Sequence, residues 1–149
     1  MDLKKIETSL NPNCIMSGEL SKDGCTVPLT NAPKQRLIVD LDKPESPLNK
    51  NHTRCDYLFF ANGKGAVCWF VPLELKRGSL PAKKIVQQLQ AGATVAEQLV
   101  ADNDPVRFRP IVASGSIHKH QRNILRNKKG DYIQKYPSKI RILSMVHWS

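Results

Sequence analysis

The stretch from Cys55 to Lys76 constrains the fold most, because two apolar runs flank a few turn-forming residues. The first run, Cys55 to Ala61, is rich in aromatic and apolar side chains, and the second, Ala66 to Lys76, is mostly apolar. Both compositions predict β-strands. Asn62-Gly63 and Gly65 tolerate the positive backbone φ angles of tight turns. This stretch therefore predicts a β-hairpin.

Three charged side chains are expected to meet at the open end of this hairpin. Side chains at i and i+2 of a strand share a face, so Glu74 and Lys76 point the same way while Leu75 points into the core. Asp56 lies at the matching end of the partner strand. Carboxylates are hard oxygen ligands that bind Mg²⁺, and a neighbouring lysine adds positive charge for a phosphoryl transition state.

The expected register leaves an offset between the two acids. Pairing through a turn centred on Gly63-Lys64 would place Asp56 opposite Val71 rather than Glu74. We therefore predict a bulge near Val71-Pro72, since proline cannot donate to a sheet ladder and occurs at bulges and edges.

An acid, a hairpin and then Glu-x-Lys resemble the signature of the PD-(D/E)XK nuclease superfamily. Asp56 matches the first acid, Glu74 the second and Lys76 the lysine, whereas Cys55 stands where the motif has proline. The resemblance implies hydrolysis of phosphodiester bonds, most often in DNA, with Mg²⁺ or Mn²⁺ bound by Asp56 and Glu74 and with Lys76 steadying the attacking water. It covers roughly residues 36–114 and implies a restriction-endonuclease-like core.

A helix is predicted from about Leu80 to Ala101, with Ser79 as its N-cap. Its apolar stripe comprises Val86, Leu89, Ala93, Ala96 and Val100. Gly92 is expected to allow close packing on the sheet. The resemblance implies that Gln88 supports the lysine and the scissile phosphate; a plain polar helix face is the alternative.

Other acidic residues are further candidates for the metal site. A short first helix is expected around Leu3 to Leu10, with a loop over residues 17–34, and either Glu7 or Glu19 could face the metal or simply lie at the surface. The strand Arg36 to Asp42 is expected beside the Asp56 strand. Its Asp40 and Asp42 share a face and either flank the site or begin the next turn.

The remaining elements complete an α/β fold with a mixed sheet of about five strands flanked by helices. A strand from Val106 to Ser114 follows the helix, and the crossover rule makes it parallel to the Glu74 strand. A last strand is expected from Lys139 to Val146. The whole chain, residues 1–149, is expected to be a single domain.

The net positive charge of the chain comes from its second half. Residues 1–75 carry 9 Lys/Arg and 9 Asp/Glu, whereas residues 76–149 carry 14 and 4, which accounts for the net charge of +10. Such asymmetry indicates a polyanionic partner, and without a wide-faced basic amphipathic helix it favours nucleic acid over a membrane. The residues predicted to bind nucleic acid are Arg107, Arg109, His118, Lys119, His120, Arg122, Arg126, Lys128 and Lys129.

Composition also limits the protein's class. No apolar run approaches the length of a membrane span, and no secretory signal follows Met1. Four cysteines without close pairing are typical of a reduced, cytoplasmic chain. The resemblance to the nuclease superfamily implies assembly as a homodimer or within a larger protein complex. Two alternatives to a nuclease remain open: a non-catalytic nucleic-acid-binding module, and a regulatory subunit that docks an acidic partner protein.

Overall fold

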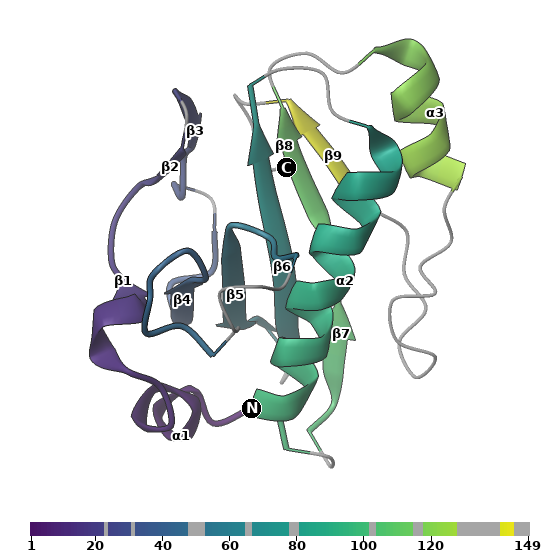
Figure 1. Cartoon of the computed structure of the whole chain (residues 1–149). Helices are drawn as coiled ribbons and strands as arrows, with labels where there is room; N and C mark the ends of the chain where they lie inside the picture. Colours follow the sequence, from purple (N-terminus) through teal and green to yellow (C-terminus); the bar gives the residue numbers. More distant parts are fainter. Residues whose placement is uncertain are drawn as a thin grey trace.

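The computed structural model is an α/β fold in which α2 (Ala82–Leu99) crosses one face of a mixed sheet (Figure 1). It describes residues 1–22, 24–30, 32–47, 53–64, 67–77, 81–101, 104–114, 118–127 and 141–144. Among these residues the main sheet has seven strands in the order β1-β4-β5-β6-β8-β9, with β7 also paired to β6. No described helix combines the length and apolar character that a transmembrane span needs.

The sheet is built from a meander followed by parallel strands. Antiparallel pairing joins β1 (Ile15–Met16), β4 (Arg36–Asp40), β5 (Tyr57–Asn62) and β6 (Cys68–Lys76). Parallel pairing adds β7 (Val106–Phe108), β8 (Ile111–Ser114) and β9 (Arg141–Ser144). The predicted parallel return after the helix is thus confirmed, although the expected strand is split in two at Arg109-Pro110. This split, together with β1 at the opposite edge, explains why five strands was too few.

Short elements surround the sheet. The predicted first helix is α1 (Leu3–Thr8), which is followed by the 3-10 turn η1 (Pro12–Cys14). Residues 17–34 are not a simple loop, because they contain the hairpin of β2 (Leu20–Lys22) and β3 (Cys25–Val27). Basic residues 119–127 form α3 (Lys119–Asn127), a helix that the sequence did not reveal.

Two cores lie on the two faces of the sheet. On the α2 face, Leu58, Phe60 and Phe70 pack against Leu89 and the other buried residues of α2. The opposite face packs Tyr57, Phe59, Val71, Leu73 and Leu75 against the β2–β3 hairpin, which supplies Leu20, Cys25 and Val27. The alternation along β5 and β6 therefore sends even-numbered side chains towards α2 and odd-numbered ones towards the hairpin.

The hairpin of β5 and β6 has a regular register. Tyr57 pairs with Leu73, Leu58 with Pro72, and Asn62 with Cys68. The prediction of a bulge near Val71-Pro72 is wrong, because the ladder between β5 and β6 is uninterrupted from Tyr57–Leu73 to Asn62–Cys68. The loop between the two strands runs from residue 63 to residue 67. Compared with a two-residue turn at Gly63-Lys64, this longer loop shifts the pairing by three residues, so that Asp56 faces Glu74 instead of Val71.

Helix α2 sits close to the sheet at Gly92. A Cβ at this position would lie 2.3 Å from the Cys55 Sγ and 2.9 Å from the Pro72 Cβ, which confirms the predicted close packing. The buried stripe is rotated from the predicted one, since Ile85, Gln88 and Gly92 are buried while Val86 and Val100 are only partly so. Ser79 lies outside the described residues. The first amide of the helix, on Ala82, donates 2.6 Å to the Oε1 of Gln121 in α3.

Replacing Gly92 by alanine is expected to destabilise the fold by about 1–3 kcal/mol. Helix propensity alone predicts the opposite sign, a gain of about 1 kcal/mol, so urea unfolding monitored by circular dichroism separates the two effects. Thr94→Ala, at an exposed position on the same helix, is the control and should change the unfolding free energy little. A stabilised Gly92→Ala variant would contradict the close approach of helix and sheet.

Candidate active site

Asp56 and Glu74 lie next to each other at the end of the β5–β6 hairpin. Continuing the ladder one step beyond Tyr57 and Leu73 sets them directly opposite. Each carboxylate also bonds to the other strand: the Asp56 amide donates 3.1 Å to Glu74 Oε2, and the Leu75 amide donates 2.7 Å to Asp56 Oδ2. These reciprocal hydrogen bonds fix one oxygen of each acid and leave the second oxygen for another partner.

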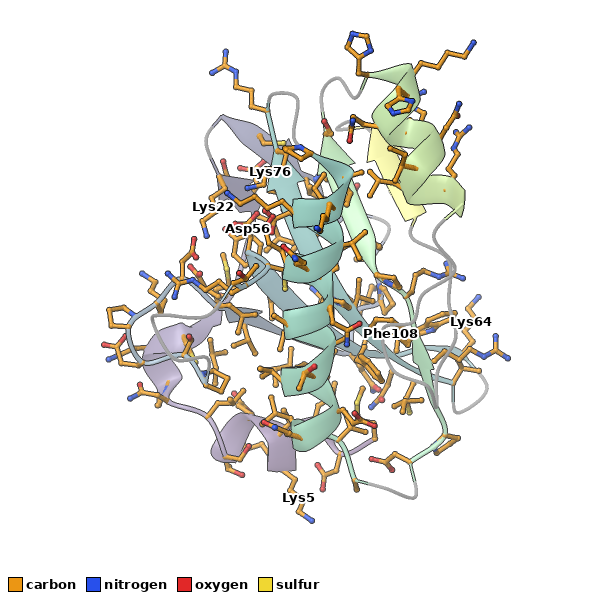
Figure 2. All side chains as sticks on the ribbon, turned by 45° about the vertical axis from the view of Figure 1, so that its right-hand side comes forward. Lys5, Lys22, Asp56, Lys64, Lys76 and Phe108 are labelled. Atoms are coloured by element: carbon orange, nitrogen blue, oxygen red, sulfur yellow. The ribbon has the colours of Figure 1, made fainter. Side chains whose placement is uncertain are left out.

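A lysine ammonium faces the second oxygen of each acid. The Nζ of Lys76 lies 2.6 Å from Glu74 Oε1, and the Nζ of Lys22, from β2, lies 3.3 Å from Asp56 Oδ1. The Glu74 side chain is fully buried, and that of Asp56 is 12% exposed. Figure 2 shows Lys22, Asp56 and Lys76 gathered on one side of α2. The sequence-predicted trio is thus close together, as expected, and has acquired a second lysine.

The protonation of Glu74 is shifted by its surroundings. Burial, together with the neighbouring charge of Asp56, raises its pKa from 4.5 to about 7, while Lys76 acts against both. The side chain therefore titrates near neutral pH. At pH 8 this carboxylate is mostly ionised, so a metal cation can bind to it without first displacing a proton.

Asp40 and Asp42 join the site through Lys22. The Lys22 ammonium is ion-paired with Asp42 and lies 4.0 Å from Asp40 Oδ1, while Asp42 also holds the Arg54 Nε at 2.9 Å. The interpretation that these acids flank the site is supported by this cluster. Asp40 also serves the turn, since its Oδ1 accepts from the Asp42 amide at 2.9 Å.

Lys22 is the residue that sequence reasoning missed. It lies in the segment interpreted as a loop, and it comes directly before Asp23-Gly24, a dipeptide typical of two-residue hairpin turns. The pairing of Lys22 with Cys25 across that turn is the arrangement such a dipeptide predicts. Recognising the turn would have found the hairpin, but only the fold brings its end to Asp56.

Gln88 is buried on the sheet-facing side of α2, and its Oε1 has no hydrogen-bond partner among the described residues. It lies one helical turn before Gly92, which rests on Pro72, and α2 runs back along β6 (Figure 1). Gln88 is therefore at the level of Glu74, two residues beyond Pro72, on the same face of β6. This placement favours the site over the plain polar face.

The two early glutamates do not join the carboxylate pair. Glu7 is on α1, at the far end of the sheet (Figure 1), and its Oε2 accepts from the Lys4 ammonium at 3.0 Å. Glu19 is exposed and lines a separate surface cavity of about 380 Å³ with Leu29 and Arg36. Both are therefore surface carboxylates, the alternative that the sequence left open.

The predicted basic residues fall into two groups. His118, Lys119, His120, Arg122 and Arg126 are exposed on or beside α3, which lies at the end of the sheet where β6 and β8 finish (Figure 1). Arg107 and Arg109 instead flank Trp69 on the β7 side, with the guanidinium carbons 5.6 Å and 4.5 Å from the centroid of its ring. Lys128 and Lys129 lie outside the described residues.

The carboxylates of Asp56 and Glu74 are the type of ligand that a magnesium ion prefers, but they are fewer than its full set of ligands. Two carboxylates, each with one oxygen already oriented by a backbone amide, provide hard ligands, and Mg²⁺ commonly completes its shell with water and substrate phosphate. Among the described residues, no group of three or more His, Cys, Asp or Glu side chains is arranged around one possible metal position. Asp56 Oδ1 and Glu74 Oε1, which now face ammonium groups, are the oxygens a metal would use.

The chain was compared with protein-family models, with curated proteins and with solved structures, and none of them matches it.

Proposed function

We propose that the protein is a metal-dependent nuclease with a restriction-endonuclease-like core. The observation that carries the proposal is the juxtaposition of Asp56 and Glu74 on neighbouring strands, with the Lys76 ammonium 2.6 Å from Glu74. Two carboxylates and a lysine on adjacent strand ends are the constellation expected for cleaving a phosphodiester bond. The mixed sheet with a helix crossing one face supports this assignment of the core.

Each residue has a distinct part in this proposal. Asp56 and Glu74 would hold Mg²⁺, which when bound acts as a Lewis acid on a phosphoryl oxygen and lowers the pKa of its water. Lys76 would donate hydrogen bonds to the attacking water and to a non-bridging phosphate oxygen, where negative charge develops. Gln88, whose Oε1 has no hydrogen-bond partner in the described part of the chain, would orient the lysine or the water.

The basic surface would hold the substrate. The exposed side chains of α3 lie at the same end of the molecule as Lys76, since β6 and β8 run parallel and Ser114 pairs with Lys76 before the chain continues to α3. Lysine and arginine contacts to phosphates supply affinity without reading sequence. DNA is the expected substrate class, and RNA shares the same backbone chemistry.

The decisive test is a cleavage assay on single-stranded and double-stranded DNA and RNA with Mg²⁺ or Mn²⁺ against EDTA. Cleavage is expected only with metal, and Lys76→Ala should reduce it by about 10²–10³-fold, the typical cost of removing one transition-state donor. Lys83→Ala, which removes an exposed lysine of α2, is the matched control and should retain activity. Absence of cleavage of every substrate would reject the nuclease assignment. Persistent binding in EDTA would then favour the non-catalytic nucleic-acid-binding module.

A further inference from the structure

A tryptophan flanked by two arginines lies on the face of β6 opposite to Glu74 and Lys76. Trp69 is half-buried in β6 and packs against the core that faces the β2–β3 hairpin, whereas Glu74 faces α2. They lie five positions apart along β6, a length of about 16 Å. Figure 2 shows Lys64 and Phe108, from the β5–β6 loop and from β7, apart from Asp56 and Lys76 along the length of the sheet.

The tryptophan is held in place by the hairpin loop. The Gly63 amide donates 2.7 Å to the Val67 carbonyl, which closes the loop beside the ring. A Cβ at position 63 would lie only 3.1 Å from the indole Nε1, so the ring edge rests against the glycine backbone. One edge of the indole is therefore covered, and the ring provides a fixed surface for the neighbouring side chains.

The two arginines are positioned by this ring and by the β7 backbone. Trp69 and Arg107 are direct partners in the parallel ladder, and the Arg109 amide donates 3.1 Å to the Phe70 carbonyl. A guanidinium held beside an aromatic ring, as that of Arg107 is, loses rotamer freedom but keeps its N–H edges, the donors that bind phosphate. Arg107 is exposed, and no described carboxylate lies within ion-pair distance of it.

We propose that Trp69, Arg107 and Arg109 form an anchoring site for single-stranded nucleic acid, separate from the carboxylate–lysine site. Stacked arginines beside an aromatic ring combine phosphate recognition with a flat surface on which a base can stack. The preference for a single strand rests on the proposed function. A stiff duplex cannot contact both faces of the sheet at once, whereas a flexible single strand can bend around its edge.

The test uses Trp69 as its own reporter. Trp148→Phe leaves it the sole tryptophan of the chain, and the protein is titrated with a single-stranded oligo(dT) and with a duplex of equal length, both in EDTA. Fluorescence of Trp69 should change on binding the single strand. Arg107→Ala/Arg109→Ala should weaken that binding by about tenfold and make the slope of log affinity against log salt shallower by about one to two.

Two matched variants separate this site from general charge. Lys4→Ala/Lys5→Ala removes the same charge from exposed positions on α1 and should change affinity less than threefold. Arg107→Lys/Arg109→Lys keeps the charge but loses the stacked, forked donors and should bind at an intermediate level. Unchanged affinity in the alanine variant, an equal loss in the α1 variant, a silent Trp69 or equally tight duplex binding at this site would overturn the proposal. Because no step requires metal or cleavage, failure of the nuclease assignment would leave the binding result readable.

Discussion

Glu74→Gln is expected to abolish metal-dependent cleavage and, at pH 8, to make the protein more stable. The loss of activity should be about a thousandfold, since a neutral amide is a poor ligand for a divalent ion and Lys76 would lose its charged neighbour. The gain in the free energy of unfolding should approach roughly 3 kcal/mol, the value that corresponds to a pKa near 7 in place of 4.5.

The sign of the stability change follows from proton binding. Between pH 4.5 and pH 7 the folded protein keeps a proton on Glu74 that the unfolded chain has lost, so stability falls as pH rises through this window. Above pH 7 the fold contains an ionised carboxylate at a fully buried position beside Asp56. Glutamine avoids that cost and retains an oxygen that can accept from the Asp56 amide, as Glu74 Oε2 does.

The measurement is urea unfolding of wild type and variant at pH 4.5 and pH 8, in EDTA, alongside the cleavage assay. The two proteins should be nearly equal in stability at pH 4.5 and should diverge at pH 8. Glu97→Gln, the same substitution at an exposed position of α2, should show neither effect. If Glu74→Gln were less stable than wild type at pH 8, the ionised Glu74 would be a stabilising ion-pair partner rather than a buried charge that costs stability.

Lys22→Met is the second substitution with a large expected effect. Methionine retains much of the apolar stem, whose ammonium lies 5.3 Å from the centre of the Tyr57 ring, but removes the charge shared by Asp40, Asp42 and Asp56. In EDTA we expect a loss of about 1–3 kcal/mol, below the cost of breaking a fully buried ion pair because the Lys22 side chain is 22% exposed.

Mg²⁺ should reverse much of this loss. Lys22 faces the Asp56 oxygen that a metal would take, so removing its charge leaves a stronger cation site and a larger rise in the unfolding midpoint on adding Mg²⁺. Thermal unfolding with and without Mg²⁺ measures the difference between variant and wild type. Lys43→Met, at an exposed position, is the control. Equal Mg²⁺ shifts in wild type and Lys22→Met would show that Lys22 does not compete with a metal.

Local pattern determined much of this protein. The alternation of Cys55–Lys76 predicted the hairpin and the common face of Glu74 and Lys76, because side-chain direction in a strand depends only on sequence parity. The β-α-β order predicted the parallel return after α2 for an equally local reason, the handedness of such crossovers. Gly92 marked the close approach of helix and sheet because only a residue without a Cβ fits there.

Only the tertiary structure decided the register of the hairpin and which distant residues contact the site. The length of the β5–β6 loop sets the register of the hairpin. Asp56 lies opposite Glu74 because the loop has five residues, a length that amino-acid composition does not predict. Lys22 reaches Asp56 only because the β2–β3 hairpin folds onto the sheet from far away in the sequence. Arg107 and Arg109 meet Trp69 for the same reason, since β6 and β7 become neighbours only after α2 has crossed the sheet. Such contacts join residues that are distant in the sequence, so the local periodicity of the sequence does not predict them.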